Sequence, residues 1–590
     1  MLTQTWGPHR GRPWQSGLWR AELRDDEIAD LRHGDALVLR SIRAVVRDRD
    51  WGTVPVTVVA STPDVDDVAA VLVLRLDGRG VAADGELRVH VDGDHLAVEL
   101  SLTATRSFDT ARAGLVALHP PQVAGAALTV EHSDGTTERT AFPELISPHQ
   151  PAFDIAGLVW DVDGLHVDAR FSGDTFEMED QRNWTDASFK TYSRPLASPF
   201  PYRVEAGETV TQRIDLTVVP AGGSSEPVPG ARSLVRLVDA GRPAPVVGVG
   251  LAPAFVAEQE AATTAGTTTT PAGVLLVELD GSSTDGEVTA ELARAVASGL
   301  PLDVRVVADD PARVDALIHQ VADARPIRLG VFSARSHVTE PSLWRALVAA
   351  ADACGLEAEL VGGARSHFTE LNRRHEELPA FPAVTISITP QMHARETFQI
   401  EESIGMQRRV AVDAARIAGG APLHVGPVTL RPRFNAVATS PIAPAAAALD
   451  ADTVDARQTA PQLATWLIAS ASALAEGGAS SVTWFEDRGP RGVEAIDGEP
   501  FPVREAMAAL HELSGAPLLL PAVTTPDDEA TRVLGVRTPR GARLLVARLG
   551  DTADDLTIDV DGRVLMLHLE PGTWRALDVE RTPRRHDKDE

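Results

Sequence analysis

The chain has 590 residues and carries 84 acidic against 55 basic side chains, so its formal net charge is −29 at pH 7. A surface this acidic repels nucleic-acid backbones and anionic membranes, and the expected partner is therefore neutral, or small enough to be held by a local basic patch. The single cysteine, Cys354, excludes an internal disulfide framework and a cysteine-based zinc site.

The length is that of about three domains. The N-terminal segment MLTQTWGPHRGRPW has no apolar run of the kind found in a signal peptide, and no stretch approaches the roughly 18 apolar residues of a membrane span. We therefore expect a cytoplasmic protein with no membrane partner and no nucleic-acid partner. The oligomeric state is left open.

Residues 1–222 are predicted to form an all-β sandwich. Apolar residues alternate with polar ones in short runs separated by Gly and Asp turns, which is typical of antiparallel strands. Clear examples are residues 54–60, 69–78, 86–104 and 213–220. A sequence rich in Gly, Ser and Pro follows, and it indicates a linker over residues 223–243.

Residues 244–515 change to apolar runs that alternate with segments of helical period. The predicted strands are residues 246–252, 274–281, 302–309, 326–334, 356–363, 383–390, 422–430 and 480–487. Helices are predicted between most of them, for example over residues 286–299, 312–324, 342–355 and 460–477. The Thr-rich connection 258–273 is expected to be a loop or a degraded first helix. This alternation predicts a (β/α)8 TIM barrel.

Strand-like alternation returns after residue 515. It predicts a small C-terminal β-sandwich over residues 516–580, followed by a disordered tail over residues 581–590. The predicted fold class is therefore a multidomain α/β and all-β chain, in which a central TIM barrel is flanked by two β-sandwiches.

Polar residues follow most of the predicted barrel strands, where the active site of such a barrel lies. These strand-end residues are Glu278, Asp280, Ser333, Arg335, His337, Glu370, Asn372, Arg373, Gln391, His393, Glu396, Arg431, Arg433, Asn435 and Glu486. The predicted substrate-binding residues among them are Asp280, Asn372, Gln391, His393, Arg431 and Asn435. His393 has two interpretations. It could polarise a carbonyl or orient a carboxylate, or it could be a packing residue with a hydrogen-bond partner.

Glu370 and Glu486 are the predicted catalytic pair. Hydrolysis at a sugar-like carbon needs two carboxylates, of which one is held protonated and the other stays ionised. Alternatives remain for both residues, because Glu486 could pair with Arg488 or Arg491 at the barrel rim. Glu370 could be an acid at a helix start that complements the helix dipole.

The sequence contains no metal-ligand spacing, no G-x-S-x-G elbow, no P-loop and no G-x-G-x-x-G motif behind a strand. We therefore expect neither a metal nor another cofactor. Serine hydrolase, kinase and dehydrogenase functions are disfavoured for the same reason.

Six stretches carry a recognisable pattern: RDRDWGTVPV (47–56), FEMEDQRNWTDASFKTY (176–192), HFTELNRR (367–374), ITPQMHA (388–394), VTLRPRFN (428–435) and VTWFEDRGPRGV (482–493). Together they resemble the bacterial D-apionate lactonase family, which is associated with catabolism of the branched sugar apiose. The resemblance implies a β domain, a TIM barrel and a C-terminal β domain, and it covers some 450 residues in patches.

The 176–192 segment concentrates acids, amides, an indole and an ammonium group within otherwise plain β-structure. Its predicted substrate-binding residues are Glu179, Asp180, Arg182, Asn183, Trp184 and Lys190. Such a segment could close the barrel mouth over a substrate. The alternative is an interdomain polar seam that sets the orientation of the domains.

The favoured function is hydrolysis of a sugar lactone of the D-apionolactone type, with Glu486 as base or nucleophile and Glu370 as its acid partner. One alternative is a furanosidase-like glycoside hydrolase that uses the same two carboxylates. A second alternative is a non-catalytic carbohydrate-binding protein. In each case the expected ligand is a small carbohydrate or sugar lactone.

Overall fold

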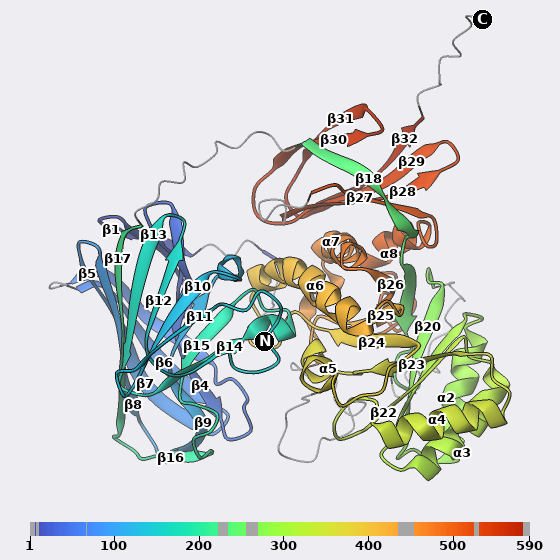
Figure 1. The fold of residues 1–590 in the computed structure, drawn as a ribbon, viewed down its shortest axis with the longest axis horizontal. Helices are drawn as coiled ribbons and strands as arrows, with labels where there is room; N and C mark the ends of the chain where they lie inside the picture. The colour runs from blue at the N-terminus through green and yellow to red at the C-terminus, as the bar shows by residue number, and fades with distance from the viewer. Residues whose placement is uncertain are drawn as a thin grey trace, which may run out of the picture.

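The computed structural model describes residues 6–7, 11–65, 68–221, 234–254, 256, 270–434, 453–523 and 530–581. Most of the predicted first barrel connection, the predicted tail after Arg581, and Asn435 lie outside the described residues. The described part of the chain forms an N-terminal β domain, a central barrel and a C-terminal sheet (Figure 1). No helix in these ranges is long and apolar enough to cross a membrane.

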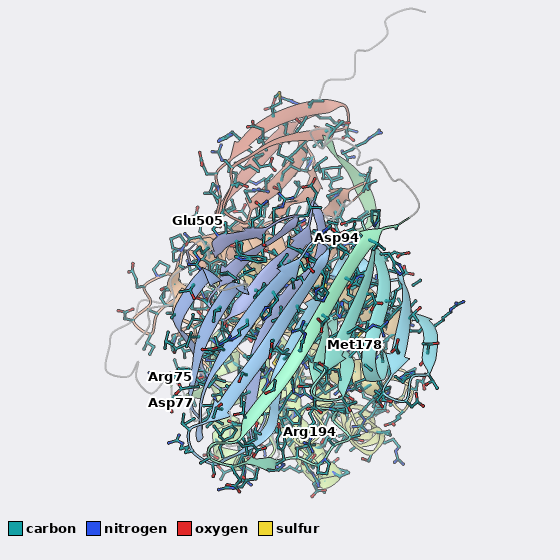
Figure 2. The ribbon with its side chains drawn as sticks, turned by 90° about the vertical axis from the view of Figure 1, so that its left-hand side faces the viewer. Arg75, Asp77, Asp94, Met178, Arg194 and Glu505 are labelled. Carbon is teal, nitrogen blue, oxygen red and sulfur yellow. The ribbon has the colours of Figure 1, made fainter. Side chains whose placement is uncertain are left out.

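The N-terminal domain is one curled antiparallel sheet of 17 strands (Figures 1 and 2). The strands are β1 (Arg12–Ser16), β2 (Trp19–Arg24), β3 (Glu27–His33), β4 (Ala36–Asp48), β5 (Val56–Val65), β6 (Val68–Gly78), β7 (Val81–Asp92), β8 (His95–Ala104), β9 (Phe108–His119), β10 (Ala127–His132), β11 (Thr137–Ala141), β12 (Ala152–Val162), β13 (Leu165–Ser172), β14 (Phe176–Asp180), β15 (Phe189–Ser193), β16 (Tyr202–Val204) and β17 (Thr209–Pro220). The 3-10 turns η1 (Pro121–Val123) and η2 (Gln181–Trp184) interrupt them. The predicted β domain is confirmed, although its layers belong to a single continuous sheet.

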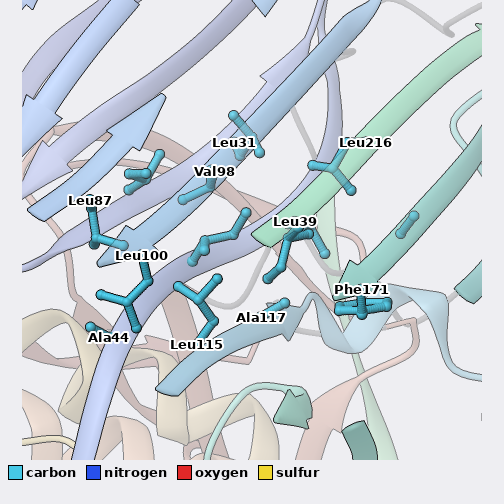
Figure 3. Close-up of a cluster of buried hydrophobic side chains, with 14 of the residues drawn as sticks. Leu31, Leu39, Ala44, Leu87, Val98, Leu100, Leu115, Ala117, Phe171 and Leu216 are labelled. Carbon is cyan, nitrogen blue, oxygen red and sulfur yellow. The ribbon is translucent and has the colours of Figure 1, made fainter. Parts of the chain in front are cut away.

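Alternation along the strands builds the core of this domain. In β8, Val98, Leu100 and Leu102 are buried while the residues between them are partly exposed, as expected when successive side chains point to opposite faces. Figure 3 shows Leu100 near Ala44 of β4 and Leu115 of β9, so strands far apart in sequence share one apolar interior.

The central domain is a closed barrel of eight parallel strands, as predicted. Its strands are β19 (Val246–Gly250), β20 (Val274–Asp280), β21 (Leu302–Val307), β22 (Arg328–Phe332), β23 (Glu359–Gly363), β24 (Ala383–Ile388), β25 (Leu423–Val428) and β26 (Ala479–Glu486). The described helices are α2 (Asp285–Ala297), α3 (Pro311–Val321), α4 (Pro341–Ala353), α5 (Phe368–Arg374), α6 (Thr397–Ala418), α7 (Gln462–Glu476) and α8 (Val503–His511), with the 3-10 turns η4 (Ala322–Ala324) and η6 (Ala456–Thr459). Every residue of β21, β24 and β25 is buried, which is typical of parallel strands covered by helices.

The C-terminal domain is a single sheet of seven strands in the order β31-β30-β18-β27-β28-β29-β32. Its strands are β18 (Leu234–Pro243), β27 (Pro517–Pro521), β28 (Thr531–Thr538), β29 (Gly541–Arg548), β30 (Asp554–Val560), β31 (Arg563–Leu569) and β32 (Thr573–Glu580). It lies against the barrel at α7 (Figure 1). Helix α7 is buried on all sides, because it lies between the barrel strands and this sheet.

The linker prediction is wrong over residues 234–243, because these residues form β18. This strand pairs antiparallel with β27 and parallel with β30. Leu237 is its one buried residue, so the strand lacks the alternating pattern by which strands are recognised. Its conformation depends on backbone hydrogen bonds to β27 and β30, two strands from the far C-terminal part of the chain.

Candidate active site

An ion cluster occupies the C-terminal end of the barrel. Glu278 of β20 accepts hydrogen bonds from Arg365, which follows β23, and from Arg433, which follows β25. The shortest N–O distances are 3.1 Å to Arg365 and 2.6 Å to Arg433. Burial opposes ionisation of Glu278, but the two guanidinium groups outweigh it and hold the pKa of this carboxyl well below its usual range.

Phe434 supports both arginines of the cluster. Its ring centre lies 4.4 Å from the guanidinium carbon of Arg365 and 5.3 Å from that of Arg433. Two guanidinium groups face one carboxylate here, so the cluster carries a surplus positive charge. A fixed positive charge at a buried position stabilises an oxyanion that forms during a reaction.

His337, which follows β22, completes this group of side chains. Its Nδ1 lies 3.2 Å from Nη1 of Arg365 and must accept that hydrogen bond, so the neutral ring carries its proton on Nε2. Burial and the neighbouring arginines lower the pKa of His337 to about 4. The ring is therefore neutral at pH 7. Its Nε2–H, which is buried and has no hydrogen-bond partner among the described residues, can donate to a substrate oxygen.

A small hollow, partly open to solvent, lies beside the cluster. Its lining residues are Ser366, His367, Ser387, Ile388, Thr389, Pro427, Thr429, Arg433 and Phe434. Burial lowers the pKa of His367 to about 3, and the charge of Arg433 contributes to this shift, so this imidazole is also neutral. The lining offers hydroxyl groups and one aromatic ring, which suits a small polyhydroxylated ligand.

Glu486 ends β26 and is turned toward this mouth by an irregularity in the strand. Val249 of β19 pairs with Trp484, but Gly250 pairs with Glu486, so the register skips Phe485, which has a φ of +53°. Trp484 donates a hydrogen bond to Ser470 of α7, on the outside of the barrel. In a regular strand Glu486 would point the same way as Trp484, and the extra residue reverses this direction.

One oxygen of Glu486 is engaged and the other is available. Arg491 lies 2.7 Å from Oε1, which is one of the two rim pairings considered from the sequence. Oε2 is buried and has no hydrogen-bond partner in the described part of the chain. Burial raises the pKa of Glu486, while Arg491 and Arg433 oppose this shift. The influence of Arg433 places Glu486 within electrostatic reach of the Glu278 cluster.

Glu370 has the helix-capping contacts that the sequence left open as an alternative. It is the third residue of α5, and its Oε2 accepts hydrogen bonds from the backbone N–H of His367 at 3.0 Å and from Oγ of Ser366 at 2.7 Å. Burial raises the pKa of Glu370. Because Ser366 and His367 line the hollow, the cap holds two lining residues in place.

Three of the predicted substrate-binding residues have structural contacts away from the cluster. Asp280 is exposed and accepts hydrogen bonds from the backbone and hydroxyl of Ser282, so it shapes the loop after β20. Gln391 and Arg431 both bind the buried carboxylate of Asp455, at 2.9 and 3.0 Å. Asn435 lies outside the described residues.

Part of the 176–192 segment forms a polar seam between the N-terminal domain and α5. Arg182 is buried, binds Asp180 with two nitrogens and donates to three backbone carbonyls of residues 143–145. Asn183 accepts a hydrogen bond from Asn372 at 3.0 Å. Asn372 also donates to the carbonyl of Ile146. The two bonds of Asn372 fit the seam alternative, and Arg182 braces the N-terminal side of this seam from within its own domain.

Other residues of the segment reach the loop after β24. His393 binds Asp186 at 2.8 Å, and its ring meets Trp184 edge-on at 5.3 Å. Lys190 forms an ion pair with Glu179, and burial lowers the pKa of Lys190 to about 8. Lys190 and His393 both line a second cavity, between the domains.

Sequence reasoning placed Glu278, His337 and Arg433 at strand ends but did not select them, and it passed over Arg365. The available signal was their position directly after barrel strands. Within the described residues, no group of three or more His, Cys, Asp or Glu side chains is arranged to hold a metal ion. The expected absence of a metal therefore stays a prediction.

The closed parallel barrel, with polar side chains gathered where its strands end, defines a TIM-barrel protein. Two family models match most of the chain: "D-apionate lactonase, N-terminal domain" matches residues 2–221, and "D-apionate lactonase, TIM barrel domain" matches residues 247–515. The chain belongs to the D-apionate lactonase family.

A curated relative and two solved structures illustrate the range of similarity. The D-apionate lactonase of Brucella anthropi is 28% identical over 520 residues, which is 82% of this chain and 84% of that protein. A β-arabinopyranosidase structure is similar over 95% of this chain and 96% of its own, at 9% identity and a TM-score of 0.30. A GH30 endoxylanase of Clostridium papyrosolvens covers 58% of this chain and 97% of its own, at 8% identity and a TM-score of 0.36.

Proposed function

We propose that this protein hydrolyses a sugar lactone of the D-apionolactone type at the C-terminal mouth of its barrel. One observation carries the proposal: Glu486, at the end of a barrel strand, has a buried oxygen without a hydrogen-bond partner among the described residues, and the charge of Arg433 acts on it. Family membership supports the lactone as the substrate class.

In the proposed reaction, Glu486 acts as a general base. Its Oε2 takes a proton from water while the water oxygen bonds to the lactone carbonyl carbon. The carbonyl oxygen gains negative charge and is stabilised by Arg365 and Arg433. The bond from the carbonyl carbon to the ring oxygen then breaks. The released ring oxygen takes the proton back from Glu486, and the products are a hydroxyl group and a carboxylic acid, which releases its proton to the solvent at neutral pH.

His337 and Glu370 have supporting roles in this proposal. The Nε2–H of His337 donates a hydrogen bond to a substrate oxygen, because the neutral ring is held in that tautomer by Arg365. Glu370 was expected to be the acid partner of Glu486. Its hydrogen bonds to Ser366 and to the backbone of His367 instead favour a positioning role beneath the hollow.

A glycoside hydrolase is the second candidate, and a specific observation favours it. The pKa values of Glu278 and Glu486 are shifted in opposite directions, one down and one up. A pair of carboxylates with separated pKa values is the pattern of a nucleophile and an acid in glycosidases. Against this assignment, both oxygens of Glu278 are bound by arginines.

One assay separates the candidates. The purified protein is incubated with a panel of sugar lactones and, separately, with nitrophenyl furanosides, each against a control without enzyme, because lactones also hydrolyse spontaneously. Acceleration with lactones alone is the expected result. Release of nitrophenol alone would establish the glycosidase, and no acceleration with either panel would favour the non-catalytic binding protein.

A further inference from the structure

A second cavity, partly open to solvent, lies between the N-terminal sheet and the barrel. From the sheet side it is lined by β4, β9 and β15, and from the barrel side by His393, Ala394, Phe398 and Gln399. We call it the interdomain cavity. It is distinct from the hollow at the barrel mouth, with which it shares no lining residue.

Basic side chains dominate the lining of the interdomain cavity. Its charged or titratable lining residues are Arg40, Arg43, Arg47, Arg112, Lys190, Glu27, Asp186 and His393. Several of these charges are already paired: Arg40 with Glu402, Lys190 with Glu179, and Asp186 with His393. Such a basic concentration is unexpected in a chain with a net charge of −29.

Arg47 and Arg112 are left without an ionic partner. Within the described part of the chain, neither guanidinium has a carboxylate at ion-pair distance. Arg47 donates to the hydroxyl of Thr53 and the carbonyl of Trp51, and Arg112 donates to the carbonyl of Arg194. Among the described residues, Nε of Arg112 has no hydrogen-bond partner, and with the residue only 5% exposed this atom is buried.

The sheet register places these two arginines directly opposite each other, Arg47 on β4 and Arg112 on β9. Like charges at directly opposed positions destabilise a sheet. Burial lowers the pKa of Arg47 to about 10; the charges of Arg112 and Arg43 act in the same direction, and those of Glu179 and Asp186 oppose it. The carboxylates of Glu179 and Asp186 offset this repulsion only in part, and the guanidinium of Arg112 lies 3.7 Å from the ring centre of Tyr192. Two buried guanidinium groups with no carboxylate of the described residues at ion-pair distance suit an anion bound between them.

We propose that the interdomain cavity binds a small polyhydroxy carboxylate, with its carboxylate held between Arg47 and Arg112. Guanidinium groups match the geometry of a carboxylate with two parallel hydrogen bonds. Gln181, Ser188 and Gln399 line the same cavity and offer partners for hydroxyl groups. The choice of a sugar acid as the ligand rests on the proposed function, because lactone hydrolysis releases a sugar acid. The inference that the ligand is an anion does not depend on the proposed function.

Calorimetric titration of the full chain with gluconate tests this site. Glucitol serves as the uncharged counterpart, and inorganic phosphate as an anion of different class. Gluconate is expected to bind and glucitol is not. Arg47→Gln is expected to weaken gluconate binding by about 10-fold or more, the usual effect of losing one charge-assisted hydrogen bond. The matched control Arg75→Gln removes an exposed arginine of the same sheet (Figure 2) and should bind normally.

A second readout separates a binding role from a structural one. Without ligand, Arg47→Gln should melt at the same temperature as the unaltered protein or higher, because it relieves repulsion from Arg112. Arg112→Lys keeps the charge but loses the planar fork, and it should also weaken gluconate binding. A lower melting temperature for Arg47→Gln combined with unchanged gluconate affinity would overturn the proposal.

The remaining outcomes distinguish this site from the barrel mouth. Glu486→Gln should bind gluconate normally. If that variant loses gluconate binding while Arg47→Gln keeps it, gluconate binds at the mouth, and the present proposal fails while the proposed function stands. Binding of phosphate without gluconate, or equal binding of glucitol and gluconate, also overturns it.

Discussion

Replacing Glu486 by Gln tests the proposed reaction most directly. The side chain keeps its volume and can still accept a hydrogen bond from Arg491, but an amide cannot take a proton from water. Oε2 is the atom lost to the reaction, since Oε1 is already engaged by Arg491. General-base catalysis contributes at least about 10²-fold, so turnover should fall by that factor, equivalent to about 2.7 kcal/mol in the activation barrier.

Glu370→Gln is the matched comparison, because it makes the same chemical change at the other predicted catalytic glutamate. Its carbonyl oxygen can still accept from Ser366 and from the backbone of His367, so the cap of α5 loses only its charge. We expect turnover within about threefold of the unaltered protein and a loss of stability of about 1 kcal/mol or less.

Initial rates of lactone hydrolysis are measured by titrating the acid released at constant pH, and thermal melting is recorded for each variant. Near-normal turnover by a well-folded Glu486→Gln protein would refute the general-base assignment. A loss of about 10²-fold in Glu370→Gln, without a change in melting temperature, would restore the Glu370–Glu486 pair expected from the sequence.

Three further predictions follow from the contacts of the site and the seam. Because burial raises the pKa of Glu486, kcat/KM should fall on the acidic side as this carboxylate is protonated, with a midpoint above the usual glutamate value, and this limb should be absent from the residual activity of Glu486→Gln. Arg182→Ala should lower the free energy of unfolding by about 3–5 kcal/mol, because it leaves Asp180 buried without its partner. The control Arg170→Ala, at an exposed ion pair, should cost about 1 kcal/mol or less. Equal melting temperatures for these two variants, or a raised KM for folded Arg182→Ala, would instead support a pocket role. Dialysis against a strong chelator should leave lactone hydrolysis unchanged, and a loss restored by a divalent cation would show that a metal is required.

Local patterns were sufficient to locate the barrel. Its strands are mostly buried on both faces, and its helices other than α7 carry one apolar stripe, so each element can be recognised from a few residues. The start of β19 at Val246 and the position of Glu486 at the end of β26 were predictable in this way. The same reasoning recognised the capping role of Glu370 as an alternative, because a helix start is also a local signal.

Tertiary structure alone decided how distant residues meet. The pairing of Glu278 with Arg365 and Arg433 joins three strand ends separated by up to 155 residues, and the skipped residue at Phe485 turns Glu486 toward them. The partners of β18 and the opposition of Arg47 and Arg112 likewise arise from strand pairing. Sequence periodicity predicts which face of an element is buried, but it does not predict which residues that face will contact. Those contacts depend on how the whole chain packs.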